Sequence, residues 1–205
     1  MTIPARGGAP VDLRRAFRLD ASSVWVVTSA DAGSPVGFTA VSVVSVSITP
    51  PILSFNVSRT SSSLHTLLRS GRFAVHLLAA DQEATARRFA GPAAERFLDD
   101  RTWSWDADGL PRLHGVLTRL SGAVLRLVEA GDSLLVLGEV SRSDEDDATA
   151  EQGTPADRRL YRGADDPLVH HDRTYTRAAT GAETRQGSRS AVSPAPTAHL
   201  TGAVA

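Results

Sequence analysis

The sequence predicts a mainly β protein with short helices, whose strands close into a small barrel. Three observations support this fold class. Residue patterns mark about seven strand-forming runs but only two or three short helices. Most of these runs follow one another directly, without the alternation of strand and helix that a doubly wound parallel sheet requires. The 205 residues, with 41% hydrophobic and 22% charged side chains, suffice for one domain with its own core.

Each predicted strand is a short apolar or alternating run that ends at turn-forming residues. The first run, VWVVT, stops at the turn sequence DAGSP, and the next alternates valine with serine before Pro50 and Pro51. Two long runs later in the chain are separated by the turn sequence EAGD. The predicted strands cover residues 24–28, 36–47, 52–57, 73–78, 116–128, 133–140 and 168–170.

Three short segments have the apolar spacing of helices. Residues 12–20 are amphipathic and predict an opening helix. Residues 64–69 predict a second helix, which ends at Gly71 because glycine readily adopts the left-handed conformation found there. Residues 81–89 predict a third, with acidic residues at its start and two arginines in its last turn, as the helix dipole favours.

We expect one folded domain at residues 11–177. The Pro- and Gly-rich residues 1–10 predict a flexible N-terminus. The polar and acidic residues 141–166 predict a surface loop or insertion. Residues 178–205 contain no Phe, Trp or Tyr and are rich in Ala, Thr, Ser, Gly and Pro, which predicts a disordered C-terminal tail.

Composition excludes several classes of function. All 22 basic residues are arginine, and the absence of Lys excludes lysine Schiff bases and a P-loop. The chain has no Cys, which excludes disulfides, thiolate nucleophiles and iron–sulfur clusters. A formal net charge of −1 provides no basic field for nucleic acid. Without a hydrophobic signal core or a membrane-length apolar run, we expect a cytoplasmic location.

A serine cluster just before the second predicted helix is the most informative local feature. Ser61, Ser62 and Ser63 would lie beside backbone N–H groups that have no partner within the helix, with Arg59 just upstream. Hydroxyls, free N–H groups and a guanidinium together suit a phosphate. The alternative is simple N-capping of the helix, which the spacing alone favours.

A second candidate is the run of small residues GFTAVSVVSVS at residues 37–47. Small side chains on a strand let a flat ligand approach the backbone, while hydroxyls and peptide N–H groups pair with its polar edge. The alternative is a Ser- and Thr-rich edge strand that faces water. From the residues alone, the two interpretations carry equal weight.

The titratable residues form no recognisable catalytic set. No pair of histidines has the spacing of a metal site, and we predict no metal. Asp132 follows Gly131 at the start of a strand, where a turn role is the simpler interpretation. His170 and His171 are adjacent on a predicted strand, so their side chains face opposite sides and only one can line a given pocket.

Seven motifs follow one another in a recognisable order: GFTAVSVVSVSITPP at 37–51, the serine cluster, GRFAVHLLAADQ at 71–82, ARRFA at 86–90, GLPRLHG at 109–115, GDSLLVLGEV at 131–140 and PLVH at 167–170. In this order the sequence resembles the flavin reductase-like family of FMN-binding split-barrel proteins, which act as reductase components of two-component flavin monooxygenases. The similarity runs from about Phe17 to Arg177. Each motif is weak alone, but together they are specific.

The resemblance implies a Greek-key split barrel that forms a homodimer and binds flavin in a groove near the subunit interface. It places Asp132 and His170 near the face of the flavin where nicotinamide stacks. Ser133 stands where the family's GDH motif has histidine, so the sequence does not distinguish NADH from NADPH. The implied flavin residues are Thr39, Ala40, Val41, Ser42, Ser45, Val46 and Ser47 at the ring and ribityl chain, and Ser61, Ser62 and Ser63 at the phosphate, with Arg59 and Arg88 as helpers.

The implied activity is that of an NAD(P)H-dependent flavin reductase, which transfers a hydride from NADH or NADPH to FMN or FAD. A separate oxygenase would receive the reduced flavin, and neither nucleic acid nor a membrane is expected as a partner. Two alternatives remain open. One is a split-barrel oxidase that keeps its FMN, and the other is a flavin-binding module without catalysis.

Overall fold

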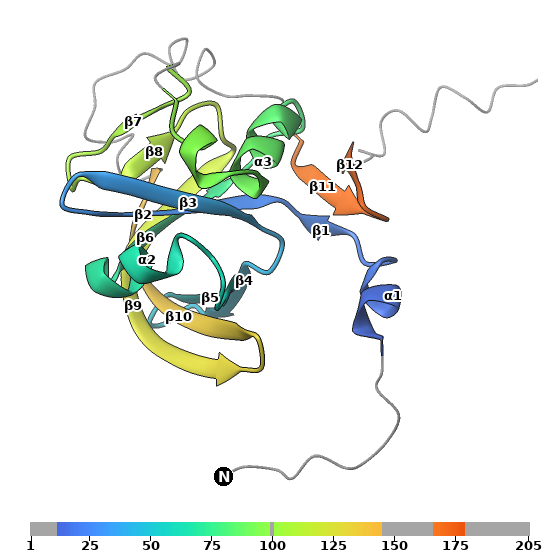
Figure 1. Ribbon diagram of the computed structural model, residues 1–205, viewed down its shortest axis with the longest axis horizontal. Helices are drawn as coiled ribbons and strands as arrows, with labels where there is room; N and C mark the ends of the chain where they lie inside the picture. The colour runs from blue at the N-terminus through green and yellow to red at the C-terminus, as the bar shows by residue number, and fades with distance from the viewer. Residues whose placement is uncertain (1–11, 99–100, 145–165, 179–205) are drawn as a thin grey trace, which may run out of the picture.

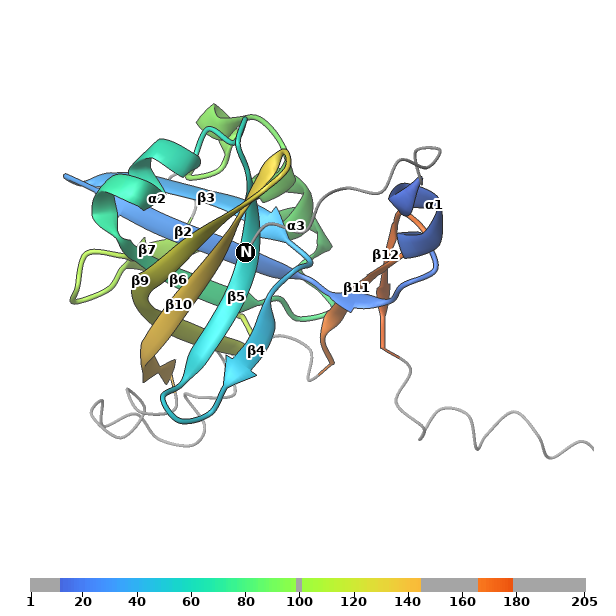
Figure 2. The same ribbon diagram turned by 90° about the horizontal axis from the view of Figure 1, so that it is seen from below.

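The computed structural model describes residues 12–98, 101–144 and 166–178 of the 205-residue chain. Its centre is a strongly curved antiparallel sheet of seven strands, in the order β3-β2-β6-β9-β10-β5-β4 (Figures 1 and 2). In chain order the strands of this sheet are β2 (Trp25–Asp31), β3 (Ser34–Ala40), β4 (Val44–Ser47), β5 (Ile52–Ser58), β6 (Arg72–Leu77), β9 (Thr118–Ala130) and β10 (Ser133–Ser143).

The two edges of this sheet are β3 and β4, which are consecutive in the sequence but stand at opposite ends of the strand order. In the described part of the chain, β3 pairs only with β2 and β4 only with β5. The barrel is therefore open between β3 and β4, and we call this opening the seam. Residues 41–43 link the two edges. The predicted fold class, a mainly β split barrel with short helices, is confirmed.

Two smaller sheets and several short helices surround the barrel. The three-stranded sheet β1-β11-β12 projects from the barrel together with α1, on the right of Figure 1. Within the described residues, no helix is long and apolar enough to cross a membrane. The remaining elements are α1 (Leu13–Phe17), β1 (Ser22–Ser23), α2 (Leu64–Ser70), α3 (Glu83–Ala90), the 3₁₀ helix η1 (Ala93–Glu95), β7 (Trp103–Trp105), β8 (Pro111–Leu113), β11 (Leu168–His171) and β12 (Thr174–Arg177).

Local turn chemistry ends two elements within or next to the turn residues that the sequence predicted. The β2–β3 hairpin turns at Ala32 and Gly33, whose φ angles of 47° and 78° match a two-residue turn of the primed type. Helix α2 ends at Gly71, which has φ 63° and donates its N–H to Leu67 O at 3.0 Å. That left-handed C-cap is the one expected from the sequence.

The interior contains two apolar clusters. The first fills the barrel, where the rings of Phe55 and Phe73 meet edge to face with centroids 5.4 Å apart. The second packs α3 and the β11 strand against the barrel end through Phe89, Leu78 and Leu168. This second cluster anchors the projecting sheet, and with it His170, to the rest of the domain.

The structure differs from the sequence prediction in several places, and it adds the strands β1 and β12, which no sequence pattern predicted. The run 36–47 is two strands, because the chain leaves β3 at Ala40 and enters β4 only at Val44. The stretch 93–114, expected to be irregular, contains η1 and the β7–β8 hairpin. Strand β10 continues to Ser143, past its predicted end at 140. Residues 1–10, most of 141–166 and nearly all of 178–205 lie outside the described residues, so those boundaries stay predictions.

A buried polar layer lies within the barrel wall. His76 on β6 is 0% exposed, and its register partner Arg119 on β9 is 2% exposed. Arg119 forms an ion pair with Asp106, whose side chain is also buried. Burial of the imidazole, followed by the positive charge of Arg119, lowers the pKa of His76 from 6.5 to about 3. His76 therefore stays neutral in the folded protein at neutral pH.

We predict that His76 makes the domain acid-sensitive. In the unfolded chain histidine binds a proton below about pH 6.5, whereas folded His76 binds one only near pH 3. The contribution of His76 to stability is therefore present above pH 6.5 and is lost as the pH falls toward 3, by roughly 1.4 kcal/mol for each pH unit. Urea denaturation of wild type and His76→Gln between pH 7 and 4 measures the difference. Parallel pH profiles would contradict this assignment.

Candidate functional site

The predicted ring-lining segment lies along the seam of the barrel. Ala40 ends β3 and is buried, and the chain then crosses to β4 through residues 41–43. Val41, Val44 and Val46 are 45%, 58% and 54% exposed. This segment therefore lies at the seam, between the two edge strands of the sheet.

The hydroxyl groups of this segment differ in what they can still bind. Thr39 Oγ1 donates to Ala86 O at 2.6 Å, so its proton ties β3 to α3. Ser42 Oγ accepts a hydrogen bond from Asn56 N at 3.0 Å, which leaves its own proton for another acceptor. Ser45 is exposed and Ser47 is partly buried. Thr39 therefore positions the strand, while Ser42 keeps a donor for a ligand.

The three serines of the predicted phosphate site have different roles in the structure. Ser63 is 1% exposed and donates to Gly37 O at 3.1 Å, so its proton is already used. It occupies the N-cap position of α2 without making a side-chain capping bond. Ser61 Oγ accepts from Ser63 N at 3.3 Å, and Ser62 is exposed. In these contacts Ser61 and Ser62 do not donate their hydroxyl protons, so both protons are available to a ligand.

The two arginines named as phosphate helpers already have protein partners. Arg59 forms an ion pair with Glu129, with Nη2 and Oε2 3.1 Å apart, and Arg88 donates to Thr102 Oγ1 at 3.1 Å. A third guanidinium, which the sequence reasoning missed, contacts the serine cluster directly. Arg96 Nη1 donates to Ser62 Oγ at 3.2 Å and to Ser63 Oγ at 3.3 Å. It follows η1 in the stretch that was expected to be irregular, where no local pattern distinguishes it.

The two predicted catalytic residues lie on different sheets. Asp132 is in the β9–β10 turn, where its carbonyl accepts from Arg59 N at 2.9 Å and its Oδ1 accepts from Ser133 Oγ at 3.0 Å. His170 is on β11, partly buried, with its ring 5.5 Å from that of Tyr175. Figures 1 and 2 both show the β9–β10 turn apart from β11. The fold of the single chain keeps the elements that hold these two side chains apart, and the neighbouring His171 is exposed.

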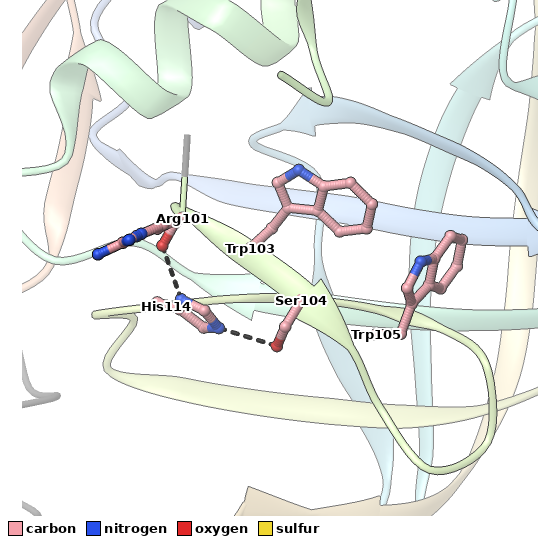
Figure 3. A pocket seen from close by; sticks show the side chains of 5 residues that line it. All are labelled: Arg101, Trp103, Ser104, Trp105 and His114. Carbon is pink, nitrogen blue, oxygen red and sulfur yellow. Dashed lines mark hydrogen bonds between the residues drawn. The ribbon is translucent and has the colours of Figure 1, made fainter. Parts of the chain in front are cut away.

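A separate pocket of about 430 Å³ lies beside β7 (Figure 3). Its lining includes Trp103, Trp105 and His114, and none of the sequence-predicted site residues. His114 uses both ring nitrogens, at 2.9 Å from Ser104 Oγ and 2.9 Å from Arg101 O. Trp103 packs edge to face on Phe97 and Trp105. Through these contacts, the residues that line the pocket stabilise the structure at one end of the barrel.

The seam and the serine cluster together can bind a ligand, but they contain no evident set of general acid and base residues. They offer small side chains, peptide groups and hydroxyl donors for a flat polar ligand, and a guanidinium next to an exposed hydroxyl. Among the described residues, no three His, Asp or Glu side chains are grouped as a metal site. Chemistry at this site would come from a bound organic group.

Comparisons with known proteins find related sequences and folds. The sequence model of the family described as "Flavin reductase like domain" matches residues 17–179. An NADH:FMN oxidoreductase of Rhodococcus qingshengii is 38% identical over 168 residues, which cover 81% of this chain and 80% of that protein.

Solved structures extend the similarity to the whole barrel. The Streptomyces globisporus C-1027 NADH:FAD oxidoreductase SgcE6, in complex with NAD and FAD fragments, aligns with a TM-score of 0.68 and 32% identity, covering 83% of this chain and 93% of that one. BorF, the flavin reductase component of a bacterial two-component tryptophan halogenase, aligns with a TM-score of 0.66 and 29% identity, covering 80% and 95%.

Proposed function

Since the chain belongs to the flavin reductase-like family, we propose that it is an NAD(P)H-dependent flavin reductase that transfers a hydride from the nicotinamide to FMN or FAD. It supplies reduced flavin to a separate oxygenase component, as relatives named reductase components do. The relatives named above use NADH by name, which favours NADH here. We place the reaction in the cytoplasm, where nicotinamide nucleotides are abundant.

One observation carries this proposal in the structure: the small-residue segment follows the seam of the barrel. A flat ring system needs backbone approach without bulky side chains, and an opening between two free sheet edges provides it. The residues present fit a flavin, because the exposed Ser62 hydroxyl keeps its proton for the phosphate end of the molecule.

We assign the flavin contacts residue by residue as follows. Ser62 and Ser61 donate hydroxyl protons to the phosphate, while the buried Ser63 holds the loop against β3. Arg59 and Arg88 add positive charge nearby but keep their protein partners. The ring and ribityl chain lie along Thr39, Ala40, Val41, Ser42, Ser45, Val46 and Ser47.

The protein's part in the reaction is binding and orientation. When bound, the flavin supplies the hydride-accepting chemistry. The seam residues hold its ring with one face open, and their peptide N–H groups stabilise negative charge that develops at its polar edge. Asp132 and His170 border the space for the nicotinamide. The Asp132 carboxylate is oriented by Ser133, the residue at the family's histidine position.

The decisive experiment follows the absorbance of NADH or NADPH in the presence of purified protein and FMN, FAD or riboflavin. We expect nicotinamide oxidation that depends on added flavin. FMN that copurifies tightly, without NADH turnover, would instead indicate the oxidase. Flavin binding without any turnover would indicate the non-catalytic module.

We predict that the double variant Ser61→Ala/Ser62→Ala weakens FMN binding by about 10-fold or more, because each change removes a donor to a charged phosphate. Riboflavin, which lacks the phosphate, should bind within about 2-fold of its wild-type affinity. Quenching of flavin fluorescence measures both affinities. Equal weakening of FMN and riboflavin would show that these serines do not contact the phosphate.

We further propose that the protein is a homodimer whose interface includes β4. This strand is an edge of the seven-stranded sheet, and Val44, Val46 and the following Ile48 are 58%, 54% and 82% exposed. Free sheet edges with apolar side chains are normally covered in stable proteins. A second copy would also supply whichever of Asp132 and His170 the same subunit holds away from the ring.

The expected result for wild type is twice the mass of one chain in light scattering after size exclusion. The variant Val44→Glu/Ile48→Glu should elute as a monomer, because charges on this strand oppose its burial. Leu98→Glu, which alters a 46% exposed apolar side chain outside β4, should remain dimeric. A monomeric wild-type protein would refute the proposal.

A further inference from the structure

Arg96 joins three separate parts of the fold through one guanidinium. Its Nε and Nη2 donate to Gly91 O at 3.1 and 2.7 Å, just after α3. Its Nη1 donates to Gly37 O on β3 at 2.8 Å, and to the hydroxyls of Ser62 and Ser63. The serine loop, strand β3 and the end of α3 are therefore held at fixed positions by the same side chain.

The charge of Arg96 meets only neutral partners. All five of its hydrogen bonds go to carbonyl or hydroxyl oxygens, and within the described residues no carboxylate lies in ion-pair contact with it. Arg59 and Arg119, by contrast, each pair with an acidic side chain. Partial burial lowers the pKa of Arg96, yet a guanidinium remains charged at neutral pH. Among the residues that the structure describes, no acidic side chain thus neutralises the positive charge at this loop.

Arg96 also decides where the hydroxyl protons of the loop point. Ser63 Oγ accepts from Arg96 and donates its single proton to Gly37 O. Ser62 Oγ accepts from the same nitrogen, so its proton is free for an acceptor outside the protein. A hydroxyl that accepts from a charged donor is polarised and donates more strongly. Ser63 is therefore a hydrogen-bond donor within the protein, whereas Ser62 is a donor toward a ligand.

We propose that Arg96 is a positioning residue that gives the enzyme its preference for phosphorylated flavins, acting through Ser62. The proposal rests on the function proposed above, since it assigns the phosphate of FMN, or the phosphate next to the ribityl chain of FAD, to the Ser62 hydroxyl. Arg96 fixes the loop, polarises this hydroxyl and leaves its proton facing the ligand. Four of the five N–H groups of the guanidinium are already engaged with the protein, which makes direct phosphate binding by Arg96 secondary.

The first test compares Arg96→Met, Arg96→Lys and wild type in flavin binding and NADH oxidation. In Arg96→Met, the dissociation constant and KM for FMN should rise by about 10-fold or more, while riboflavin changes by less than about 2-fold and kcat at saturating flavin stays near wild type. Arg96→Lys keeps the charge and should recover part of the FMN preference. Arg142→Met removes a half-exposed arginine that pairs with Asp108, and it should change the affinity for neither FMN nor riboflavin.

The second test is a double-mutant cycle that combines Arg96→Met with Ser62→Ala. If Arg96 acts through Ser62, its replacement in the Ser62→Ala background should weaken FMN by no more than about 3-fold. If the two substitutions instead raise the FMN dissociation constant by the product of their separate factors, Arg96 binds the phosphate itself and the positioning role is overturned. If Arg96→Met changes the dissociation constants of FMN and riboflavin equally, Arg96 does not give the enzyme its preference for phosphorylated flavins.

Two readouts keep this inference separate from the proposed function. Flavin binding by fluorescence tests Arg96 even if no nicotinamide is oxidised, whereas absence of turnover in wild type refutes only the reductase activity. Thermal melting reports whether Arg96→Met still folds. If it does not, the FMN to riboflavin affinity ratio of Arg96→Lys decides, since a ratio equal to that of wild type refutes the proposal.

Discussion

Replacing Gly122 by alanine is expected to destabilise the domain by about 3 kcal/mol or more, because the added methyl has no space. Gly122 lies on β9 opposite Val140 of β10, beside a register shift in the ladder. A Cβ atom there overlaps the carbonyl oxygen of Glu139 and lies 2.8 Å from its carbon and 2.9 Å from Val140 Cα. These neighbours are backbone atoms, so no side-chain rotation relieves the clash.

Gly131→Ala is the matched control for this prediction. Gly131 lies in the turn between the same two strands, with φ 61° and no atom near the position of a Cβ. Its substitution costs only the strain of a left-handed alanine, about 1 kcal/mol. Chemical denaturation of both variants measures the difference. Similar losses in the two would show that β9 and β10 do not approach each other so closely.

Removing the buried cation by Arg119→Leu is expected to cost about 3–5 kcal/mol of stability. The guanidinium is 2% exposed and pairs with Asp106, which would be left as a buried carboxylate without its counter-ion. Asp106 Oδ1 also accepts from the N–H groups of Asp108 and Leu110, at 2.9 and 2.7 Å. The substitution therefore disturbs both the ion pair and the turn that leads into β8.

A surface pair provides the comparison for Arg119. Arg142 and Asp108 lie 3.1 Å apart with both side chains about half exposed, and Arg142→Leu should cost less than about 1 kcal/mol. Combining Arg119→Leu with Asp106→Asn should recover part of the loss, because the uncompensated charge is then removed. Denaturation midpoints of the single and double variants test this. An Arg119→Leu protein as stable as Arg142→Leu would show that the Arg119–Asp106 pair is solvated.

Much of the fold was predictable because its signals are local. The turn at Gly33 and the helix end at Gly71 follow from the left-handed backbone conformation that glycine readily adopts. The break at residues 41–43 was not predictable, since its valine and serine residues continue into β4 in the same pattern. Strand β7 was missed because Trp103–Trp105 is too short to show a periodicity.

The candidate site was predictable as a set of residue types and less so as a set of roles. The sequence identified Ser61, Ser62 and Ser63 as one cluster, but only the structure separates the buried Ser63 from the exposed Ser62. Arg59 lies just before the cluster in the sequence, yet in the structure its guanidinium pairs with Glu129. Arg96, 34 residues beyond Ser62, is the guanidinium that contacts the cluster.

The sequence by itself determined most of the longer elements, the class of fold and the flavin reductase family, because turn residues, β-branched runs and ordered motifs lie at neighbouring positions in the chain. Only the tertiary structure decided which serine hydroxyl donates its proton within the protein and which arginine contacts the serine cluster. Ser63 reaches Gly37 across 26 residues, and Arg96 reaches Gly37 across 59. The partner of a hydroxyl proton or a guanidinium is the acceptor that lies nearest in space. Which acceptor that is depends on how the sheet curves and brings distant residues together.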